Sequence, residues 1–520
     1  MTNNNSKSLE SWIWDAACAI RGAQDAPKYK DFILPLIFVK RLCDVFDDEV
    51  SRVAENVGSK EKALKLIAKD RKLTRFYIPL RPENLDESTW SVIRKLSSKI
   101  DEQLTDFMRS IARENSRLQG IIDRIDFNAT THGQRDIEDD RLSNLIEEIS
   151  KKRLGLKDVE PDILGRSYEY LIRKFAEGGG QSAGEFYTPM EVGLIMARIL
   201  DPEPGMEMYD PCTGSAGLLI KLQIALQEKM SLRSKTKYAP LKLFGQEYLS
   251  NTWAMANMNM VIHDMEGVIE IGDTMNNPKF REGNKLKKFD RVAANPMWNQ
   301  SLFNQKTYEN DELERFPAGY PPNGTADWGW VQHMLASLND TGRAAIVLDT
   351  GAVSRGSGNQ STNKEKEIRK WFVENDFIEG VLYLPENLFY NTSAPGIVLF
   401  LNRNKPSGKK DKILLVNASK DFIKGQPKNY IPEENQSKIV DAFLNWPVPS
   451  GKEIEKFSKI IAKDEAVKND YNLSPTRYIH TADEEVYRPI GEILEELKEL
   501  EQESKEIDIE IKSIFQKLGY

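Results

Sequence analysis

The sequence predicts an α/β protein: a mostly parallel sheet with helices on both faces, preceded by a helical region and followed by a coiled-coil helix. Between about residues 166 and 475, short apolar runs alternate with stretches of helical periodicity. This alternation is typical of parallel strands joined by crossover helices. The last two runs are separated by only about a dozen residues, Pro385–Gly396, too few for a helical crossover. We therefore expect the final strand pair to be antiparallel.

Seven apolar runs are the predicted strands of this sheet. They are Met206–Tyr209, Leu241–Phe244, Val268–Ile271, Phe289–Ala294, Ala344–Leu348, Ile378–Leu384 and Ile397–Leu401. A further run, Ile413–Val416, is a candidate extension of the sheet.

The region before the sheet, residues 1–165, is predicted to be an all-helical domain. Apolar residues share one helical face there, and further helices are expected at roughly 88–118 and 137–152. The residues of that face are Leu34, Phe38, Leu42, Val45 and Phe46. The sheet domain is then expected over 166–475 and a helical tail for subunit docking over 476–520.

The tail carries an apolar 3,4 repeat over four heptads, with one polar interruption. The positions are Ile490, Ile493, Leu497, Leu500, Ser504, Ile507, Ile511, Ile514 and Leu518. Such a narrow stripe predicts a coiled-coil seam. A helix folded back on its own catalytic domain is the alternative, and we favour an intermolecular seam because no earlier segment has a matching repeat.

Composition excludes several classes of protein. No apolar run approaches the ~18 residues of a membrane span, and the polar start lacks the core of a signal peptide. Three distant cysteines suit a reducing cytosol, and four scattered histidines without a Cys-x-x-Cys pair give no recognisable metal site. The net charge of -8 means that a nucleic-acid substrate would require a local basic face or a partner.

The most informative motif is Asn295-Pro296-Met297-Trp298, which follows the predicted strand Phe289–Ala294. The side-chain oxygen of Asn295 and the carbonyl oxygen of Pro296 can both accept hydrogen bonds from an exocyclic amino group. The ring of Trp298 can stack on the base that carries this group. The motif therefore predicts methyl transfer to an amino nitrogen.

A glycine-bearing turn, Asp210–Gly217, joins the first strand to an apolar helix. Its backbone amides can approach a charged ligand, but it lacks the full spacing of a dinucleotide site. Glu247 ends the second strand, where a carboxylate can bind ribose hydroxyls, and Asp273 ends the third, where it can accept from an adenine amino group. These residues and Asn295 are thereby predicted to share one edge of the sheet, where open α/β sheets bind ligands.

These motifs resemble the modification (methyltransferase) subunit of type I restriction–modification systems. The matching stretches include Gly184-Glu-Phe-Tyr-Thr-Pro189, Asp210–Gly217, Gly245-Gln-Glu247, Gly272-Asp-Thr274 and Asn295–Trp298. Their order is similar to that of amino-group DNA adenine methyltransferases. The amino-terminal Gly22–Asp44 stretch, Tyr471–Pro475 and the terminal helix are also similar, so the resemblance covers nearly the whole chain.

The resemblance implies a Rossmann-like, seven-stranded methyltransferase sheet and S-adenosylmethionine as cofactor. The residues implied to bind it are Glu185, Phe186, Tyr187, Thr188, Pro189, Asp210, Thr213, Gly214, Ser215, Gly217, Glu247 and Asp273. A flipped adenine would contact Asn295, Pro296 and Trp298. The implied partners are DNA, a specificity subunit flanked by two methylating subunits, and a restriction subunit, all in the cytoplasm.

Several alternatives remain at this stage. The commoner family tetrapeptide is Asn-Pro-Pro-Phe or Asn-Pro-Pro-Tyr, so Met297 removes some rigidity from the turn. Pro211-Cys212 resembles a cytosine-methylating nucleophile, although its place in the cofactor loop favours a small turn residue. Methylation of protein glutamine and a non-catalytic scaffold are the rival functions. The polar segment Asn299–Trp330 is predicted to be either disordered or a lid, with Lys306 and Arg315 solvated.

Overall fold

The computed structural model describes residues 9–19, 30–131, 134–159, 161–178, 188–233, 237–301, 305–359, 363–390, 392–426, 428–446, 456–480 and 490–517. The chain divides into two compact units, Met1–Ile479 and His480–Tyr520. The first unit holds the helical region and the sheet, and the second holds the terminal helix.

The region before the sheet is mainly helical. Its helices are α1 (Leu9–Cys18), α2 (Lys30–Val57), α3 (Lys60–Lys69), α4 (Ser91–Arg94), α5 (Ile100–Glu114), α6 (Asp139–Ser150) and α7 (Pro161–Gly178). The predicted apolar face of α2 is buried, but so is almost every residue from Ile33 to Phe46. Because α2 is enclosed on all sides, it is the central helix of this region.

Two details of this region differ from the prediction. The expected helix over 88–118 is interrupted between α4 and α5, where Lys99 adopts a left-handed conformation with φ 47°. The region is also not entirely helical, since Thr130–Thr131 (β1) and Gln134–Arg135 (β2) pair as a short antiparallel hairpin. A hairpin of this length leaves no hydrophobic alternation for sequence analysis to detect.

The central sheet has nine strands rather than the predicted seven. They are β3 (Glu207–Asp210), β4 (Lys242–Glu247), β5 (Gly267–Ile271), β8 (Phe289–Ala294), β9 (Leu338–Asp349), β10 (Ile378–Tyr383), β11 (Gly396–Asn402), β12 (Lys412–Asn417) and β13 (Ser458–Ala462). Their order is β13-β12-β10-β11-β9-β8-β3-β4-β5. All seven predicted strands are present, β12 is the candidate extension, and only β13 was not predicted.

The pairing of the strands confirms a mixed sheet. Strand β3 is parallel to both β4 and β8, and β8 is parallel to β9. Strand β11 runs antiparallel to β10 and β9, with Leu382 opposite Val398. The expected antiparallel final pair is therefore confirmed, and the ends of β3, β4, β5 and β8 lie along one edge.

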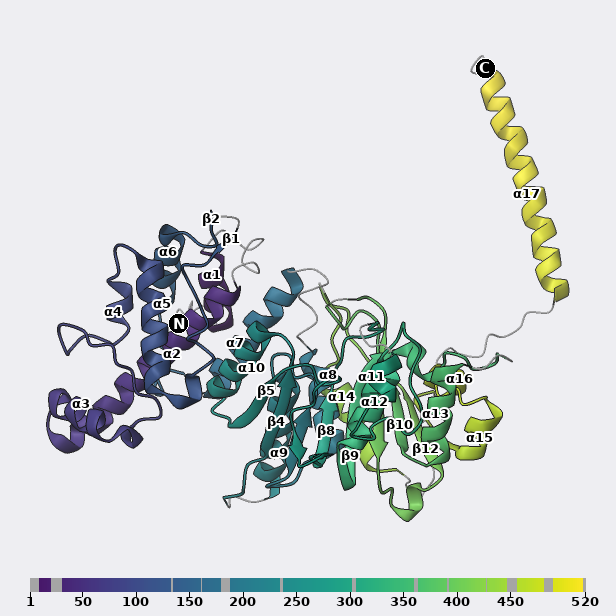
Figure 1. Ribbon diagram of the computed structural model, residues 1–520. Helices are drawn as coiled ribbons and strands as arrows, with labels where there is room; N and C mark the ends of the chain where they lie inside the picture. The colour runs from purple at the N-terminus through teal and green to yellow at the C-terminus, as the bar shows by residue number, and fades with distance from the viewer. Residues whose placement is uncertain are drawn as a thin grey trace. The chain divides into compact units, whose positions relative to one another are not determined.

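Helices cover both faces of the sheet (Figure 1). One layer consists of α8 (Met190–Leu200), α9 (Gly217–Arg233), α10 (Ser250–Ile262) and α14 (Glu433–Leu444), and the other includes α12 (Asp327–Ala336), α13 (Lys364–Glu374) and α15 (Lys463–Lys468). Along β9, Ala345 and Val347 face the first layer while Ile346 and Leu348 face the second. Burial on both faces explains why the central strands are continuous apolar runs.

Helix α10 belongs to two hydrophobic cores. Ala256 and Met260 pack in the core beneath the sheet, whereas Met255, Met258 and Ile262 pack in the core of the amino-terminal helices. Arg75 pairs with Asp264, just beyond the end of this helix, at 2.9 Å. The amino-terminal region is thereby packed directly against the helix that follows β4.

The remaining elements are short, apart from the terminal helix. They are α11 (Gln305–Glu309), α16 (Pro475–Tyr478), the hairpin of β6 (Arg281–Glu282) and β7 (Lys285–Leu286), and α17 (Ile490–Lys517). The predicted seam positions Leu497, Leu500 and Ile507 of α17 are each at least half exposed. The last seam position, Leu518, lies outside the described residues. None of the helices that the structure describes has the length and apolar character of a membrane span.

Candidate active site

The target turn, Asn295–Trp298, begins immediately after β8. The side-chain amide of Asn295 is held at both ends: its Nδ2 donates to Thr188 Oγ1 at 3.1 Å, and its Oδ1 accepts from Trp298 Nε1 at 3.3 Å. Pro296 is buried, and Met297 is 45% exposed. Three of the predicted site residues therefore meet directly, and Met297 extends toward solvent.

The ring of Trp298 lies against a second aromatic side chain. Its centroid is 4.8 Å from that of Phe389, with the planes inclined at 71°. Gly396 lies beneath both rings, since a Cβ placed there would come within 2.9 Å of Trp298 and of Phe389. Sequence reasoning missed Phe389, although its position after β10, on the same sheet edge, was a usable signal.

A buried charged cluster supports the residue after the turn. Asn299 has φ 53°, and its backbone N–H donates to Asp327 Oδ1 at 3.1 Å. Arg355 pairs with Asp327 at 2.7 Å, Asp349 at 2.9 Å and Glu365 at 2.7 Å. Burial, with Asp349 nearby, raises the pKa of the Asp327 carboxyl. The guanidinium of Arg355 thus links α12, β9 and α13, and Asp327 connects this cluster to the residue after the target turn.

The cofactor loop is held mainly through its backbone. The N–H of Thr213 donates to the Gln246 carbonyl at 3.0 Å, and the Asn259 side chain donates to the Ser215 carbonyl at 2.9 Å. Gly214 and Ala216 both have positive φ, 54° and 64°. Left-handed backbone at a non-glycine residue is uncommon and often marks a functional loop.

Glu247 fastens this loop to the end of β4. Its Oε2 accepts from the backbone N–H of Gly214, and its Oε1 accepts from Leu249, both at 2.9 Å. Burial raises the pKa of the Glu247 carboxyl. Burial, with Glu247 nearby, also raises the pKa of Asp210 to about 7. The structure therefore brings Asp210, Gly214 and Glu247 together.

Asp273 has a different environment. Its Oδ1 accepts from the backbone N–H groups of Met275 and Asn276, at 2.9 and 3.1 Å, and caps its own turn. The neighbouring Thr274 contacts the cofactor loop, donating from Oγ1 to the Pro211 carbonyl at 2.6 Å. The Gln246 side chain, which sequence reasoning also missed, donates to the Gly272 carbonyl at 3.1 Å and fixes this turn beside β4.

Cys212 is the residue of the cofactor loop that lies beside the target turn. The backbone of Asn295 interacts with the Cys212 sulfur, so the two motifs are neighbours. Burial, together with the nearby Asp210 and Glu247, raises the pKa of the Cys212 thiol well above its usual range. A thiol that stays protonated is a poor nucleophile, which favours the role of a small turn residue.

The segment after the target turn is largely packed. Tyr308, Trp328 and Trp330 are buried, so the disordered alternative is wrong for the described residues 299–301 and 305–330. Arg315 is not solvated as expected: it is 2% exposed and donates to the Thr274 and Met275 carbonyls at 3.2 and 2.7 Å. It therefore anchors the turn that carries Asp273.

The remaining predicted residues are placed only in part. Pro189 is buried at the start of α8, and Gly217 begins α9. Glu185, Phe186 and Tyr187 lie outside the described residues, so their predicted contacts with the cofactor stay predictions.

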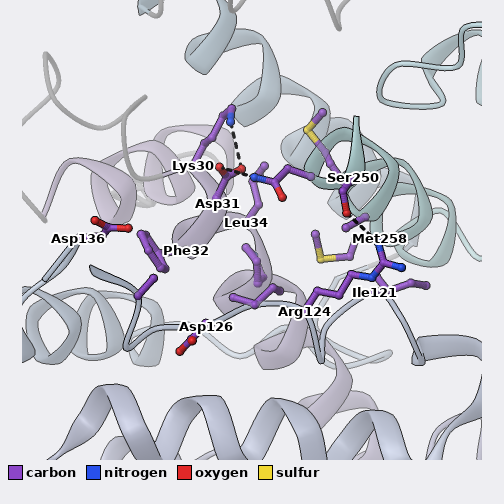
Figure 2. A pocket seen from close by; sticks show the side chains of 16 residues that line it. Lys30, Asp31, Phe32, Leu34, Ile121, Arg124, Asp126, Asp136, Ser250 and Met258 are labelled. Atoms are coloured by element: carbon purple, nitrogen blue, oxygen red, sulfur yellow. Dashed lines mark hydrogen bonds and ion pairs between the residues drawn. The ribbon is translucent and has the colours of Figure 1, made fainter. Parts of the chain in front are cut away.

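Two cavities lie beside these residues. One, of about 670 Å³, is lined by Pro189 and Leu388, the sequence neighbours of Thr188 and Phe389, and by Arg173, Lys174 and Lys428. The other, of about 720 Å³, lies between α2 and the start of α10. Figure 2 shows its rim, where Arg124 donates to Ser250 at 2.7 Å and Asn251 donates to Asp31 at 3.1 Å. The first cavity is thus lined by residues next in sequence to Thr188 and Phe389, and the second by Ser250 and Asn251, which follow Glu247 in the chain.

Comparisons with known proteins identify the family of this chain. A family model described as N-6 DNA methylase matches residues 159–486, and one described as the HsdM N-terminal domain matches residues 9–149. The MjaVII methylase subunit of type I restriction enzymes, from Methanocaldococcus jannaschii, is 33% identical over 482 residues, which cover 90% of this chain and 77% of that protein. The MjaIX methylase subunit from the same organism is 30% identical and covers 98% of this chain and 92% of its own length. A crystal structure of the type I restriction-modification system methyltransferase subunit from Streptococcus thermophilus aligns with a TM-score of 0.73 at 27% identity, covering 91% of this chain and 99% of that one.

Proposed function

We propose that this chain transfers a methyl group from S-adenosylmethionine to the N6 amino group of an adenine in DNA. The chain belongs to the methylase (modification) subunit family of type I restriction–modification systems. The single observation that carries the amino-group assignment is the clamped amide of Asn295, which lies at the end of β8 beside the cofactor loop. The match to the N-6 DNA methylase family model supports adenine as the base. A carboxamide oxygen and the carbonyl of Pro296 are suited to accept the two hydrogens of an exocyclic amino group.

The residues at the sheet edge fit S-adenosylmethionine by their chemistry. A carboxylate has about four lone-pair sites. Each oxygen of Glu247, already accepting one backbone N–H, therefore retains capacity for a ribose hydroxyl. Asp273 would accept from the adenine amino group of the cofactor, and the loop Asp210–Gly217 would present backbone groups to its charged end. Glu185, Phe186, Tyr187, Thr188 and Pro189 are proposed to complete the site.

When bound, this cofactor supplies an activated methyl group on a sulfonium sulfur. Transfer of that methyl group to N6 would release the thioether S-adenosylhomocysteine, and the proton given up by N6 would pass to solvent. Asn295 and Pro296 would hold N6 with its lone pair directed at the methyl carbon, and Trp298 would stack on the base. Positioning of this kind supplies much of the rate acceleration in a displacement with a good leaving group.

The target adenine would have to leave the duplex to reach Asn295. The cavity of about 670 Å³ offers Tyr170, Tyr390 and Tyr430 as stacking surfaces for a displaced base. Its charged lining is mixed, with Arg173, Lys174 and Lys428 beside Glu10, Glu169, Glu191 and Glu433. The net charge of -8 leaves the remaining phosphate contacts to a partner.

That partner would be the specificity subunit, flanked by two copies of this chain, with a restriction subunit joining in the cytoplasm. Exposed Leu497, Leu500 and Ile507 on α17 support a docking role for the tail. Deleting residues 485–520 should abolish co-purification with the specificity subunit and leave cofactor binding by this chain unchanged.

The deciding experiment is radiolabel transfer by the chain co-expressed with its specificity subunit. We expect label on adenine N6 of duplex DNA, none on DNA without adenine in the target, and none on protein glutamine. Asn295→Ala should reduce the rate on the order of 100-fold and leave the Kd for S-adenosylmethionine unchanged. Label on protein alone would favour the glutamine alternative, and no cofactor binding by the intact complex would favour the scaffold alternative.

A further inference from the structure

We infer that the indole N–H of Trp298 selects the orientation of the Asn295 side-chain amide and so acts as a positioning residue for methyl transfer. This inference rests on the proposed function, because it concerns how Asn295 receives the amino group. The observation behind it is the clamp on Asn295, whose Nδ2 faces Thr188 Oγ1 at 3.1 Å and whose Oδ1 faces Trp298 Nε1 at 3.3 Å.

The two ends of this clamp differ in what they can distinguish. The hydroxyl of Thr188 can donate or accept a hydrogen bond, so it tolerates either orientation of the Asn295 amide. The indole of Trp298 can only donate. If the amide turned over, its NH2 group would face the indole N–H, and two donors would oppose each other. Trp298 is therefore the partner that discriminates between the two orientations.

The orientation that Trp298 selects is the one that the proposed chemistry needs. An exocyclic amino group offers hydrogens, so Asn295 must present its oxygen to the base. A carboxamide oxygen has two lone pairs. One can accept from Trp298 while the other remains for N6. The amide is thus oriented before the base arrives, which reduces the reorganisation required for reaction.

The surroundings of Trp298 hold the indole in place. Phe389 packs against the ring at 4.8 Å, and Gly396 permits close approach of the strand beneath it. A phenylalanine at this place would keep the ring but lose the donor, and a tyrosine would carry its hydroxyl at the far end of the ring.

The test replaces the donor without changing the ring. In the complex with its specificity subunit, Trp298 is replaced by benzothienylalanine, which carries sulfur in place of the indole N–H, and in parallel by Trp298→Phe. Single-turnover methyl transfer should slow by about 10-fold in both, while the Kd values for S-adenosylmethionine and for target DNA stay within about 2-fold. Trp330→Phe is the matched control, because Trp330 Nε1 donates to Gln300 Oε1 at the same 3.3 Å; its rate should be unchanged.

A second arm separates orientation from general support. In an Asn295→Asp background both side-chain oxygens are equivalent, so there is no amide orientation to select. Adding Trp298→Phe should then change the residual rate by less than about 2-fold. A full wild-type rate with benzothienylalanine would overturn the inference, as would a weakened cofactor Kd that accounts for the whole loss. Absence of adenine methylation by the wild-type complex would instead contradict the proposed function.

Discussion

The cofactor loop and the target turn share one edge of the sheet but are stabilised in different ways. The loop is fixed through its backbone: the N–H groups of Thr213 and Gly214 bond to β4, and two residues have positive φ. The target turn is fixed through side chains: Asn295 and Trp298 bond within the turn, and Thr188 reaches Asn295 from a distant segment. The binding of a ligand by backbone groups depends on the conformation of the loop. The positioning of a target amino group depends instead on which side-chain atom faces it.

Two glycines, one beneath each motif, allow this contrast to be tested. The largest effect is expected for Gly245→Ala in β4, because the new Cβ would lie 2.3 Å from Thr213 Oγ1 and 3.1 Å from its Cγ2. The loop would have to shift as a body, and overpacking of this kind costs about 1–3 kcal/mol. We expect the Kd for S-adenosylmethionine, measured by calorimetry, to rise by about 30-fold.

Gly193→Ala in α8 is the control for this substitution. Its new Cβ would meet Leu218 at an ordinary 3.4 Å. Equal cofactor affinity in Gly245→Ala and Gly193→Ala would show that the backbone shape of the loop does not determine binding.

The next effect is expected for Gly396→Ala, beneath the target turn. Its Cβ would lie 2.9 Å from Trp298 Cη2 and 2.9 Å from Phe389 Cε2, so the indole would be displaced. We expect single-turnover methyl transfer to slow by about 10-fold while the cofactor Kd stays unchanged. Weaker cofactor binding with an unaffected transfer rate would reverse the proposed division between the two motifs.

A smaller effect concerns the buried carboxyl of Asp210, whose pKa is raised to about 7. In the unfolded chain this pKa is about 3.9. A raised pKa gives stability that is present below the unfolded pKa and is lost as the pH rises through the folded one. Raising the pH from 5 to 8 should therefore lower the Tm of the wild type relative to Asp210→Asn, by about 2 °C.

Thermal melts of both proteins without cofactor, in buffers of matched ionic strength, measure this difference. A Tm difference that is constant over the range would mean that Asp210 does not take up a proton in the folded protein.

The smallest effect is expected for Cys212→Ser. The thiol pKa is raised well above its usual range, so no thiolate nucleophile is present near neutral pH. Because the structure uses the residue as a small part of a turn, methyl transfer should stay within about 3-fold of wild type. Complete loss of transfer with normal cofactor affinity would instead assign the sulfur a chemical role.

Sequence patterns predicted the sheet well because burial on both faces produces long apolar runs. They failed at β13, an edge strand in which Ser458, Lys459 and Ile460 are only half-buried, so no clear period appears. Glycines, carboxylates and Asn295 at strand ends were predicted to share one edge of the sheet, and the structure brings them together there. Contacts between segments distant in sequence, such as Trp298 with Phe389 or Arg355 with Asp327, leave no local signal.

The presence of a charged residue in a loop was the least reliable indicator of that residue's environment. Arg315 lies in a polar segment yet is buried among backbone carbonyls, because a guanidinium can satisfy several orphan acceptors at once. Asp273 was correctly placed after β5, but its carboxylate caps its own turn. A strand-end acid can therefore be located from sequence, while the groups that it binds depend on the neighbouring loops.

Because of helix α10, the boundary between the helical region and the sheet region lies at a different place in the folded protein than in the sequence. Its Met255, Met258 and Ile262 are buried among side chains of the helical region, which extends to Phe175 in α7, although the helix itself follows strand β4 in the chain. A fragment that begins with the sheet region would expose this apolar side of a helix that starts three residues after Glu247. Replacing either region alone would therefore require rebuilding the apolar sides of α10, because both cores contain its residues.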